Sequence, residues 1–284
     1  MDAWTFEAIG TQWQIDSAEP VPPAVRESVS ARIDEFDRDW SRFRDDSFVA
    51  RVAAEPGEHS LPVDAADLFA LYDILDELTE GAVNPLAGAA LVALGYDAHH
   101  SLVQSGPPVA ARPWSSVQRT DGHVVTTGEL IDVGAAGKGR LVDLVSATLV
   151  DHEVTDHTVD AGGDLLHRSG STLRVGLEHP ADATRAIGVI ELAPGRALCG
   201  SAVNRRAWGD GLHHVVDART GRPTQDVIAV WVAADTCMLA DGLATAHFFT
   251  EPATLMGRFD HQFVRMHADG RVVWSPNFPG EVFA

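Results

Sequence analysis

The amino-acid sequence predicts an α+β protein, and two observations support that class. In the first half of the 284-residue chain, apolar residues recur three and four positions apart, as in amphipathic helices. Most of the second half instead consists of short β-rich runs broken by Gly, Pro and Asp. Because helices and strands are segregated more than alternated, α+β is favoured over a doubly wound α/β fold. No polar linker divides the chain, so we expect one domain over residues 1–284.

The first expected elements are a strand and two helices. Residues 4–16 alternate large apolar with polar side chains and break at Gly10, which predicts a strand with a kink. Apolar residues then recur at helical spacing over residues 23–40, which predicts an amphipathic helix. A second leucine-rich stripe predicts a helix from about residue 65 to residue 80, ended by Gly81.

The middle of the chain leads into a glycine-rich segment. Residues 83–97 predict a short helix after a proline, and residues 101–116 form a loop-rich stretch. Residues 123–134 indicate a pair of strands, followed by a third helix that begins in the segment VGAAGKGRLVDLV. After the β-rich runs, the segment TCMLADGLATAHFF at 236–249 predicts a last helix.

Composition and charge exclude some classes of protein. An apolar content of 45% and a charged content of 22% are typical of a globular protein. The net charge of −20 disfavours nucleic-acid binding, which needs a basic surface, and is read first as an adaptation for solubility. The N-terminus MDAWTFEAIG lacks the features of a signal peptide, and no run approaches the ~18 apolar residues of a membrane span. We therefore expect a cytoplasmic protein without a membrane partner.

Two cysteines, Cys199 and Cys237, form neither a metal-binding pattern nor a disulfide framework. Buried free thiols are the favoured interpretation, because free cysteine behaves as a small apolar residue. A single disulfide is the alternative.

The last predicted helix carries a carboxylate and a hydroxyl at helical spacing. Asp241 and Thr245 are four residues apart and share one helix face. Such hard oxygen ligands suit Mg²⁺ that is shared with substrate phosphates. Judged alone, the pattern favours the alternative that Asp241 caps the helix and Thr245 is a buried hydroxyl.

Two further motifs have both structural and chemical interpretations. In HHVVDARTGRP, Asp217 begins a tight turn, and the adjacent His213 and His214 point to opposite faces, so one should face the interior. In DAGGD, residues 160–164, the glycines allow close approach of a ligand or form a β-turn.

The glycine-rich segment is a candidate anion site. It lacks both the Ser or Thr of a P-loop and the glycine spacing of a dinucleotide fold. Small residues at 134–137 leave backbone groups open, and Lys138 adds a positive charge at the helix start. Helix N-termini of this kind attract phosphate.

Several motifs run along the chain in a characteristic order. They are IGTQWQI, SRFRDDSFVARV, GAVNPLAG with LGYD, IDVGAAGKGRLVD, DAGGDLL, RVGLEHP, GSAVNRRAW, HHVVDARTGRP and MLADGLATAHF. In this order they resemble the motifs of the ApbE family, the FAD:protein FMN transferases, over residues 9 to about 249. The most specific parts are D-x-G-x-x-x-K-G-x-x-x-D, H-x-x-D-x-x-T-G-x-P and A-D-x-L-A-T-A.

The resemblance implies a T-fold-related α+β domain with an FAD cleft between a helical part and a β-rich part. It further implies an enzyme that uses Mg²⁺ and takes FAD as its substrate. FMN is transferred to a Thr or Ser hydroxyl of a target flavoprotein, and AMP is released. Two alternatives are a Mg²⁺-dependent FAD pyrophosphatase that forms FMN and AMP, and a non-catalytic FAD-binding protein.

The resemblance also implies roles for individual residues. The cation is held by Asp241, Thr245 and the backbone carbonyl of Ala135, with the carbonyl of Ala244 as a further ligand. With the resemblance, metal ligation is favoured over the helix cap. Lys138 matches a cation beside the phosphates or nucleotide. The positions matching the reacting centre are His214, as a hypothesis the group that orients or deprotonates the hydroxyl, and Asp217.

The positions that match the family's flavin and nucleotide contacts are Ile9, Phe43, Ala82, Val83, Asn84, Asp132 and Val216. Three positions depart from the family pattern. Asn84 replaces an aspartate, which weakens any interaction that needs a carboxylate. Gly200 stands in the place of a threonine, which removes a hydroxyl near the substrate. Ala218 replaces a proline, which costs turn rigidity.

Overall fold

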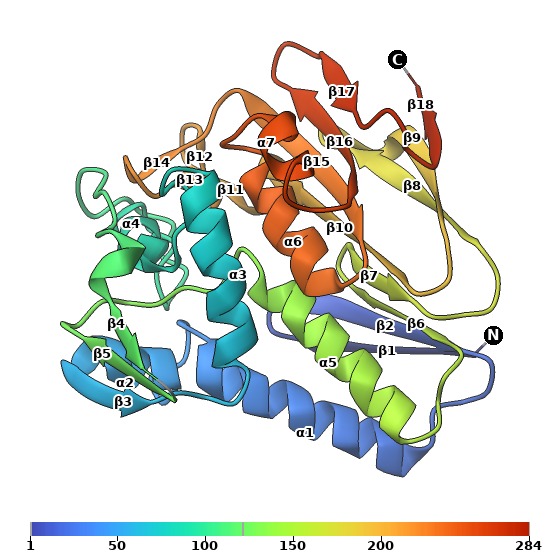
Figure 1. Ribbon diagram of the computed structural model, residues 1–284, viewed down its shortest axis with the longest axis horizontal. Coiled ribbons are helices and arrows are strands. Elements are labelled where there is room, and N and C mark those ends of the chain that lie inside the picture. The colour runs from blue at the N-terminus through green and yellow to red at the C-terminus, as the bar shows by residue number, and fades with distance from the viewer. Residues whose placement is uncertain (1, 121, 284) are drawn as a thin grey trace.

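The computed structural model describes residues 2–120 and 122–283, so both ends of the domain predicted over 1–284 lie just outside the described residues (Figure 1). An antiparallel eight-stranded sheet forms the centre of the fold, in the order β1-β2-β6-β7-β10-β15-β16-β17. Its strands are β1 Asp2–Ala8, β2 Thr11–Ser17, β6 His157–Ala161, β7 Asp164–His167, β10 Arg196–Ala202, β15 Val227–Ala234, β16 Gln262–His267 and β17 Val272–Trp274.

The helices of the described residues lie beside this sheet, and two of them pack directly on one of its faces. The helices are α1 Pro23–Trp40, α2 Phe48–Ala54, α3 Ala65–Leu78, α4 Gly88–Ala93, α5 Gly137–Asp151, α6 Cys237–Ala246 and α7 Pro252–Met256, with 3₁₀ turns η1 Pro85–Ala87, η2 Trp114–Ser116 and η3 Val203–Arg206. Helices α5 and α6 lie side by side against the sheet, α1 runs below α5, and α3 packs beside α6 (Figure 1). The predicted α+β class is confirmed.

Four smaller sheets complete the fold. A three-stranded sheet in the order β18-β9-β8 covers the other face of the central sheet, and a second one in the order β3-β5-β4 lies near α2 (Figure 1). Two short ribbons pair β11 with β12 and β13 with β14. The bounds are β3 Gly57–Ser60, β4 Gln118–Thr120, β5 His123–Thr126, β8 Leu173–His179, β9 Asp182–Leu192, β11 Ala207–Trp208, β12 Leu212–His213, β13 Val216–Asp217, β14 Arg222–Pro223 and β18 Gly280–Val282.

Strand β15 shows how the layers are held together. Its side chains alternate between the faces of the sheet, as the period of a strand requires. Val230 and Val232 join the core beneath the helices, whereas Ala229 and Trp231 join a second core beneath β8 and β9. Because both faces are buried, the strand is apolar along its whole length, and the two cores fix the helical and β-rich layers on a common sheet.

The N-terminal segment corrects one prediction. Residues 4–16 form a hairpin of two paired strands, not one kinked strand. Ile9 and Gly10 at its turn have φ angles of 45° and 74°, the left-handed values that tight hairpin turns require. Alternation of apolar and polar residues is the same in one strand as in two, so the pattern alone did not reveal the reversal.

Other elements follow the sequence more closely. The helix over residues 23–40 is confirmed, and the second helix ends at Leu78, two residues before the expected end. The strand pair expected within residues 123–134 is wrong, since only β5 lies there and its partners are β3 and β4.

The two cysteines are free, as expected. Both thiols are buried, and their Sγ atoms lie 3.3 Å apart between β10 and the start of α6. Across residues 2–120 and 122–283, the structure contains no helix with the length and apolarity that a membrane span requires.

Candidate active site

The start of α5 is in direct contact with the middle of α6. The backbone N–H of Gly139 donates to Oδ2 of Asp241 at 2.9 Å. A Cβ atom at position 139 would lie 2.3 Å from the carbonyl oxygen of Cys237 and 2.8 Å from Cβ of Asp241. Only glycine therefore allows the helices to approach this closely, and the contact holds the Asp241 carboxylate in place.

A second residue of the same motif caps α6. Oδ1 of Asp143 accepts the N–H of Cys237 at 2.8 Å, and Oδ2 accepts that of Met238 at 2.9 Å. Thr236, the N-cap residue, accepts from Leu239. The first N–H groups of α6 are thus satisfied by Asp143 and Thr236. Asp241 lies further along the helix, so the helix-cap alternative for it is wrong.

Three oxygen groups meet where the glycine-rich loop touches α6. Oγ1 of Thr245 lies 3.5 Å from the carbonyl oxygen of Ala135, and Asp241 is one helical turn earlier on the same face. The hydroxyl of Tyr72 accepts the N–H of Ala135 at 3.2 Å and so orients the loop.

The carbonyl of Ala244 is also left open by the end of the helix. Phe248 donates its N–H to Thr245 and not to Ala244, so the helical ladder stops before it reaches that carbonyl. Among residues 2–120 and 122–283, no cluster of three or more His, Cys, Asp or Glu side chains could hold a metal. A set of one carboxylate, one hydroxyl and backbone carbonyls is instead typical of a hard cation such as Mg²⁺.

The charges around Asp241 fit a cation. Asp164 and Asp241 are 1% and 7% exposed, and Lys138 pairs with Asp164. Burial, followed by the negative charge of Asp164, raises the pKa of Asp241 well above its ordinary value. One ammonium group does not neutralise two buried carboxylates, so a divalent cation would compensate the charge that remains.

Lys138 has two partners within the chain itself. Its Nζ pairs with Asp164 and donates to the carbonyl of Ala161 at 3.2 Å. Burial alone would lower its pKa, yet the charges of Asp164 and Asp241 raise it above the ordinary value. Lys138 is therefore charged and links the start of α5 to the DAGGD turn. Through Ala161 and Asp164, that turn holds the side chain of Lys138 in place.

Asp132 anchors the other end of the glycine-rich loop. Its Oδ1 accepts the N–H of Gly134 at 2.7 Å, and its Oδ2 lies 2.5 Å from Nε of the buried Arg42. The Arg42 guanidinium lies over the rings of Phe43 and Tyr96, at 4.2 and 4.6 Å from their centroids. Phe43 also stacks on His100, with centroids 4.7 Å apart. The predicted residues Asp132 and Phe43 thus belong to one cluster.

His214 lies beside η3 and is half-buried. Its Nδ1 is 3.4 Å from the carbonyl oxygen of Arg206, which can only accept, so Nδ1 carries the proton and Nε2 has a free lone pair. Burial, followed by the charge of Arg206, lowers the pKa of His214 to about 4. The imidazole is therefore neutral at pH 7. His213 is buried and bonds to the carbonyl of Thr224, which confirms that one histidine of the pair faces the interior.

Asp217 holds its own turn together. Its carboxylate accepts from the backbone N–H, Nε and Nη2 of Arg219 at 2.9, 2.9 and 2.7 Å, and its carbonyl accepts from Thr220 and Gly221. The turn interpretation is confirmed, and the carboxylate is engaged by a guanidinium within that turn.

Ala82, Val83 and Asn84 are buried beside this turn. The carbonyl of Ala82 accepts the N–H of Ala218 at 3.0 Å. Asn84 caps η1 through Leu86, while its Nδ2 donates to the carbonyl of Arg112 at 2.8 Å. A carboxylate could not make that second bond, so the asparagine has a structural reason in this chain.

The remaining predicted residues lie around the same region. Val216 is buried with Tyr96 and Trp208. Ile9 forms the β1–β2 turn. Two residues later, Thr11 packs against Gly162, where an added Cβ atom would lie 2.2 Å from the Thr11 hydroxyl oxygen.

Gly200 packs against Trp231. A Cβ atom at position 200 would lie 3.2 Å from the indole ring. Trp231 therefore fills space that a threonine side chain at this position would need.

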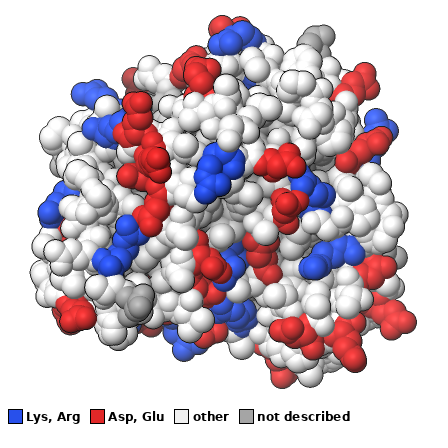
Figure 2. Space-filling view, viewed as in Figure 1, with Lys and Arg blue, Asp and Glu red and all other residues white. Residues whose placement is uncertain are grey.

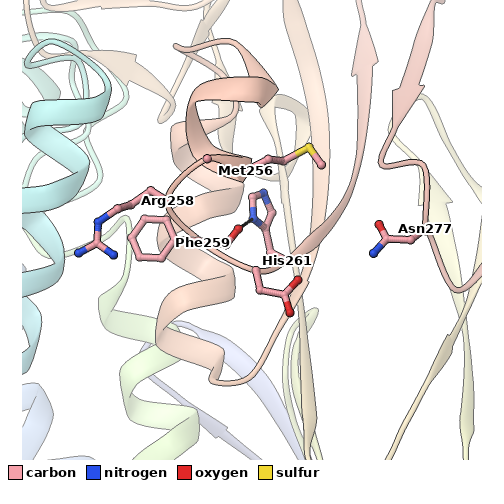
Figure 3. A pocket seen from close by; sticks show the side chains of 7 residues that line it. Met256, Arg258, Phe259, His261 and Asn277 are labelled. Atoms are coloured by element: carbon pink, nitrogen blue, oxygen red, sulfur yellow. Dashed lines mark hydrogen bonds between the residues drawn. The ribbon is translucent and has the colours of Figure 1, made fainter.

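Two surface cavities lie apart from these groups. One, of about 290 Å³, is lined by residues 256–261 and Asn277, and Figure 3 shows His261 within it, with Nδ1 bonded to the carbonyl of Phe259. The other, of about 360 Å³, lies near the ends of α3 and α6 and includes Arg219 and Arg265. None of the predicted site residues lines either cavity.

Sequence reasoning missed several residues that build the site. Gly139 and Asp143 were part of a recognised motif, whose spacing was the available signal, but their contacts with α6 join residues 102 and 94 positions apart. Asp164 was noted only as part of a turn. Arg42 and Arg206 lie within the quoted motifs SRFRDDSFVARV and GSAVNRRAW but were not singled out, because an arginine in sequence alone is indistinguishable from a surface residue.

Taken together, an α+β scaffold brings a glycine-rich helix start and hard oxygen ligands beside a cluster of aromatic and basic residues. This combination is typical of proteins that act on phosphate-bearing nucleotides. The chain belongs to the ApbE family, which matches residues 9–264.

The relatives agree with this assignment. A Rhodobacter capsulatus protein named FAD:protein FMN transferase is 28% identical over 262 residues, which cover 85% of this chain and 50% of that protein. The chain thus corresponds to half the length of that relative. A Vibrio cholerae protein of the same name is 26% identical over 240 residues, covering 78% of this chain and 72% of that protein.

A solved structure supports the fold. The ApbE protein of Thermotoga maritima superimposes with a TM-score of 0.86 over 99% of each chain, at 21% sequence identity. The α+β architecture of this chain is thus the one observed in a solved ApbE protein.

Proposed function

We propose that this chain is a Mg²⁺-dependent FAD:protein FMN transferase. FAD would be its substrate and a Thr or Ser hydroxyl of a target flavoprotein its acceptor. The names of the curated relatives support FMN transfer. The observation that carries the proposal is the meeting of Asp241, Thr245 and the Ala135 carbonyl at the start of α5. Because β1 and β17 belong to one sheet, we also propose that residues 1–284 act as one domain.

The proposed reaction is a substitution at phosphorus. The oxygen of the acceptor hydroxyl forms a bond to the phosphorus of the FMN half of FAD. The bond from that phosphorus to the bridging oxygen breaks, and AMP leaves with the electron pair. The hydroxyl proton goes to a base, and Nε2 of His214 has the free lone pair for this role. A pKa of about 4 makes His214 unprotonated at pH 7 but a weak base, so orientation of the hydroxyl is its main contribution.

The residues present fit a Mg²⁺ ion. Asp241, Thr245 and the carbonyls of Ala135 and Ala244 would hold it, and the partly uncompensated charge of Asp164 and Asp241 favours a cation there. When bound, Mg²⁺ supplies positive charge to the diphosphate. In this chain Gly139 fixes the Asp241 carboxylate, and Lys138 with Asp164 ties the loop to β7.

The flavin and nucleotide would lie along the aromatic and apolar groups beside the loop. The residues proposed to contact FAD are Ile9, Phe43, Ala82, Val83, Asn84, Asp132, Lys138 and Val216. Asp217 would act by holding the turn beside His214, since its carboxylate is engaged by Arg219. The cytoplasmic location remains a prediction from the sequence.

Covalent labelling tests the proposal. The purified chain is incubated with FAD, Mg²⁺ and a desalted protein extract of its source cells, and proteins are separated on a denaturing gel. The expected result is a flavin-fluorescent protein band together with released AMP. An Asp241→Asn variant should give neither. AMP and free FMN without a labelled protein would indicate a pyrophosphatase and contradict the transferase.

A further inference from the structure

Two adjacent arginines at the end of η3 have different environments. Nη2 of Arg205 pairs with Glu178 at 3.1 Å. The guanidinium of Arg206, which is exposed, has no ion pair or hydrogen bond within residues 2–120 and 122–283. Arginine side chains without a partner are common on protein surfaces, so a functional role for Arg206 depends on where its guanidinium lies.

The backbone of Arg206 is fixed against the candidate site. Its carbonyl accepts the N–H of His214 at 3.3 Å and lies 3.4 Å from the Nδ1 of the same residue. Its Cζ lies 5.8 Å from the centroid of the Tyr96 ring, which packs edge-on against Phe43 at 5.3 Å. The guanidinium therefore lies beside the aromatic cluster that contains Tyr96 and Phe43, close to His214.

The other positive groups of the site are already neutralised. Lys138 pairs with Asp164, Arg42 with Asp132, and Arg219 with Asp217. The charge of Arg206 lies near His214 and contributes to lowering the pKa of that imidazole. A bound dianionic group would thus meet one arginine whose hydrogen-bond donors are free.

We propose that Arg206 binds the diphosphate of FAD, with its free guanidinium N–H groups donating to the phosphate oxygens. This inference rests on the proposed function, because it names the group that receives the substrate's negative charge. A planar guanidinium offers two parallel donors to a phosphate, and such charged bonds are among the strongest in proteins. Arg206 would thus add a positive group on the β-rich side to Lys138, which is paired with Asp164.

Binding measurements with a neighbouring control test this proposal. FAD is titrated into the full chain in the presence of Mg²⁺ and followed by flavin fluorescence, for the wild type, Arg206→Gln, Arg206→Lys and Arg205→Gln. Loss of a charged hydrogen bond predicts a Kd for FAD that rises about 10- to 100-fold in Arg206→Gln. Arg206→Lys should recover part of the loss. Arg205→Gln, which removes the same charge one residue away, should stay within about twofold of the wild type.

Two further readouts separate the explanations. Riboflavin lacks phosphate, so its binding should be equal in Arg206→Gln and wild type, whereas a merely structural role would weaken both ligands and lower the melting temperature. An unchanged Kd for FAD in Arg206→Gln, or an equal loss in Arg205→Gln, would overturn the proposal. If the wild type itself fails to bind FAD, the proposed function fails first, and the role of Arg206 fails with it.

Discussion

Because residue 139 is glycine and has no side chain, α5 and α6 can approach each other closely at the site. The Gly139→Ala substitution would force a Cβ to within 2.3 Å of the Cys237 carbonyl and 2.8 Å of Asp241. Overpacking of this kind costs about 1–3 kcal/mol of the free energy of unfolding. Because the substitution also moves Asp241, we expect the Mg²⁺ concentration for half-maximal AMP release to rise about tenfold or more.

Urea unfolding and Mg²⁺ titration of Gly139→Ala measure these two effects. Gly106→Ala serves as the control, since a Cβ at position 106 meets no atom within 4 Å and its φ is not left-handed. A Gly139→Ala variant that needs no more Mg²⁺ than the wild type would contradict the positioning of Asp241 by this contact.

A buried histidine pair gives the chain a pH-dependent stability. His261 donates from Nδ1 to Phe259, so its Nε2 accepts from Nε2 of His247 at 2.9 Å, and Nδ1 of His247 is buried without a partner. Burial, followed by the charge of His261, lowers the pKa of His247 to about 3, against roughly 6.5 in an unfolded chain.

The sign of this effect follows from proton binding. Between pH 6.5 and pH 3 the unfolded chain binds the proton at His247 and the folded chain does not, so stability falls as the pH falls. Each such group contributes at most about 1.4 kcal/mol per pH unit. We expect wild type to lose more unfolding free energy than His247→Asn between pH 7 and pH 5, as urea unfolding can measure. Equal losses in the two proteins would refute the assignment to His247.

At the scale of elements, the site depends on the junction of α5 and α6. Asp143 in α5 caps the first turn of α6, four residues before Asp241. Loss of a cap costs about 0.5–2 kcal/mol. We therefore expect Asp143→Ala to lower the unfolding free energy by that amount. Because α6 carries Asp241 and Thr245, we also expect the variant to need a higher Mg²⁺ concentration for half-maximal AMP release.

The matched control for this variant lies on the same helix. Asp151, at the end of α5, is exposed, and Asp151→Ala should change the unfolding free energy by less than about 0.5 kcal/mol. If both alanine variants lose the same stability, the cap does not hold α6 in the way described.

Helices were predicted better than their contacts. The apolar stripes predicted α1 and α3 because helical spacing is a local property of the sequence. The β1–β2 hairpin was predicted as a single strand, and α2 and β3 were not predicted because they have only 7 and 4 residues. The hydrogen bond that the N–H of Cys237 donates to Asp143 joins residues 94 positions apart, and no local sequence pattern indicates such a partner.

At the scale of the whole molecule, the acidic excess should affect stability. The net charge is −20, and acidic side chains are spread over much of the face in Figure 2, with basic side chains between them. Self-repulsion of like charges opposes the compact state. Raising NaCl from about 10 mM to about 150 mM shortens the screening length from roughly 30 Å to 8 Å. We therefore expect the melting temperature to rise over this range. A melting temperature that falls with salt would show that attractive ion pairs dominate.

The global outline of the site could be predicted, whereas its charge balance could not. The order of the motifs led to the ApbE fold and to a shared site for Asp241, Thr245 and Ala135. The pairing of Lys138 with Asp164 could be identified only from the structure, because β7 and α5 are separate in the sequence and meet only in the folded chain. Arg206 became a candidate only once the partners of the other cations were known.

We propose that a cation held at Asp241 drives cleavage of FAD. The most direct test of this proposal is AMP release from FAD, with the same protein extract as acceptor source, measured with and without Mg²⁺ for the wild type and Asp241→Asn. We expect release to require Mg²⁺ and to fall about 100-fold or more in the variant, since a carboxylate ligand is lost while the side-chain volume stays the same. Release that persists without Mg²⁺, or in Asp241→Asn, would contradict it.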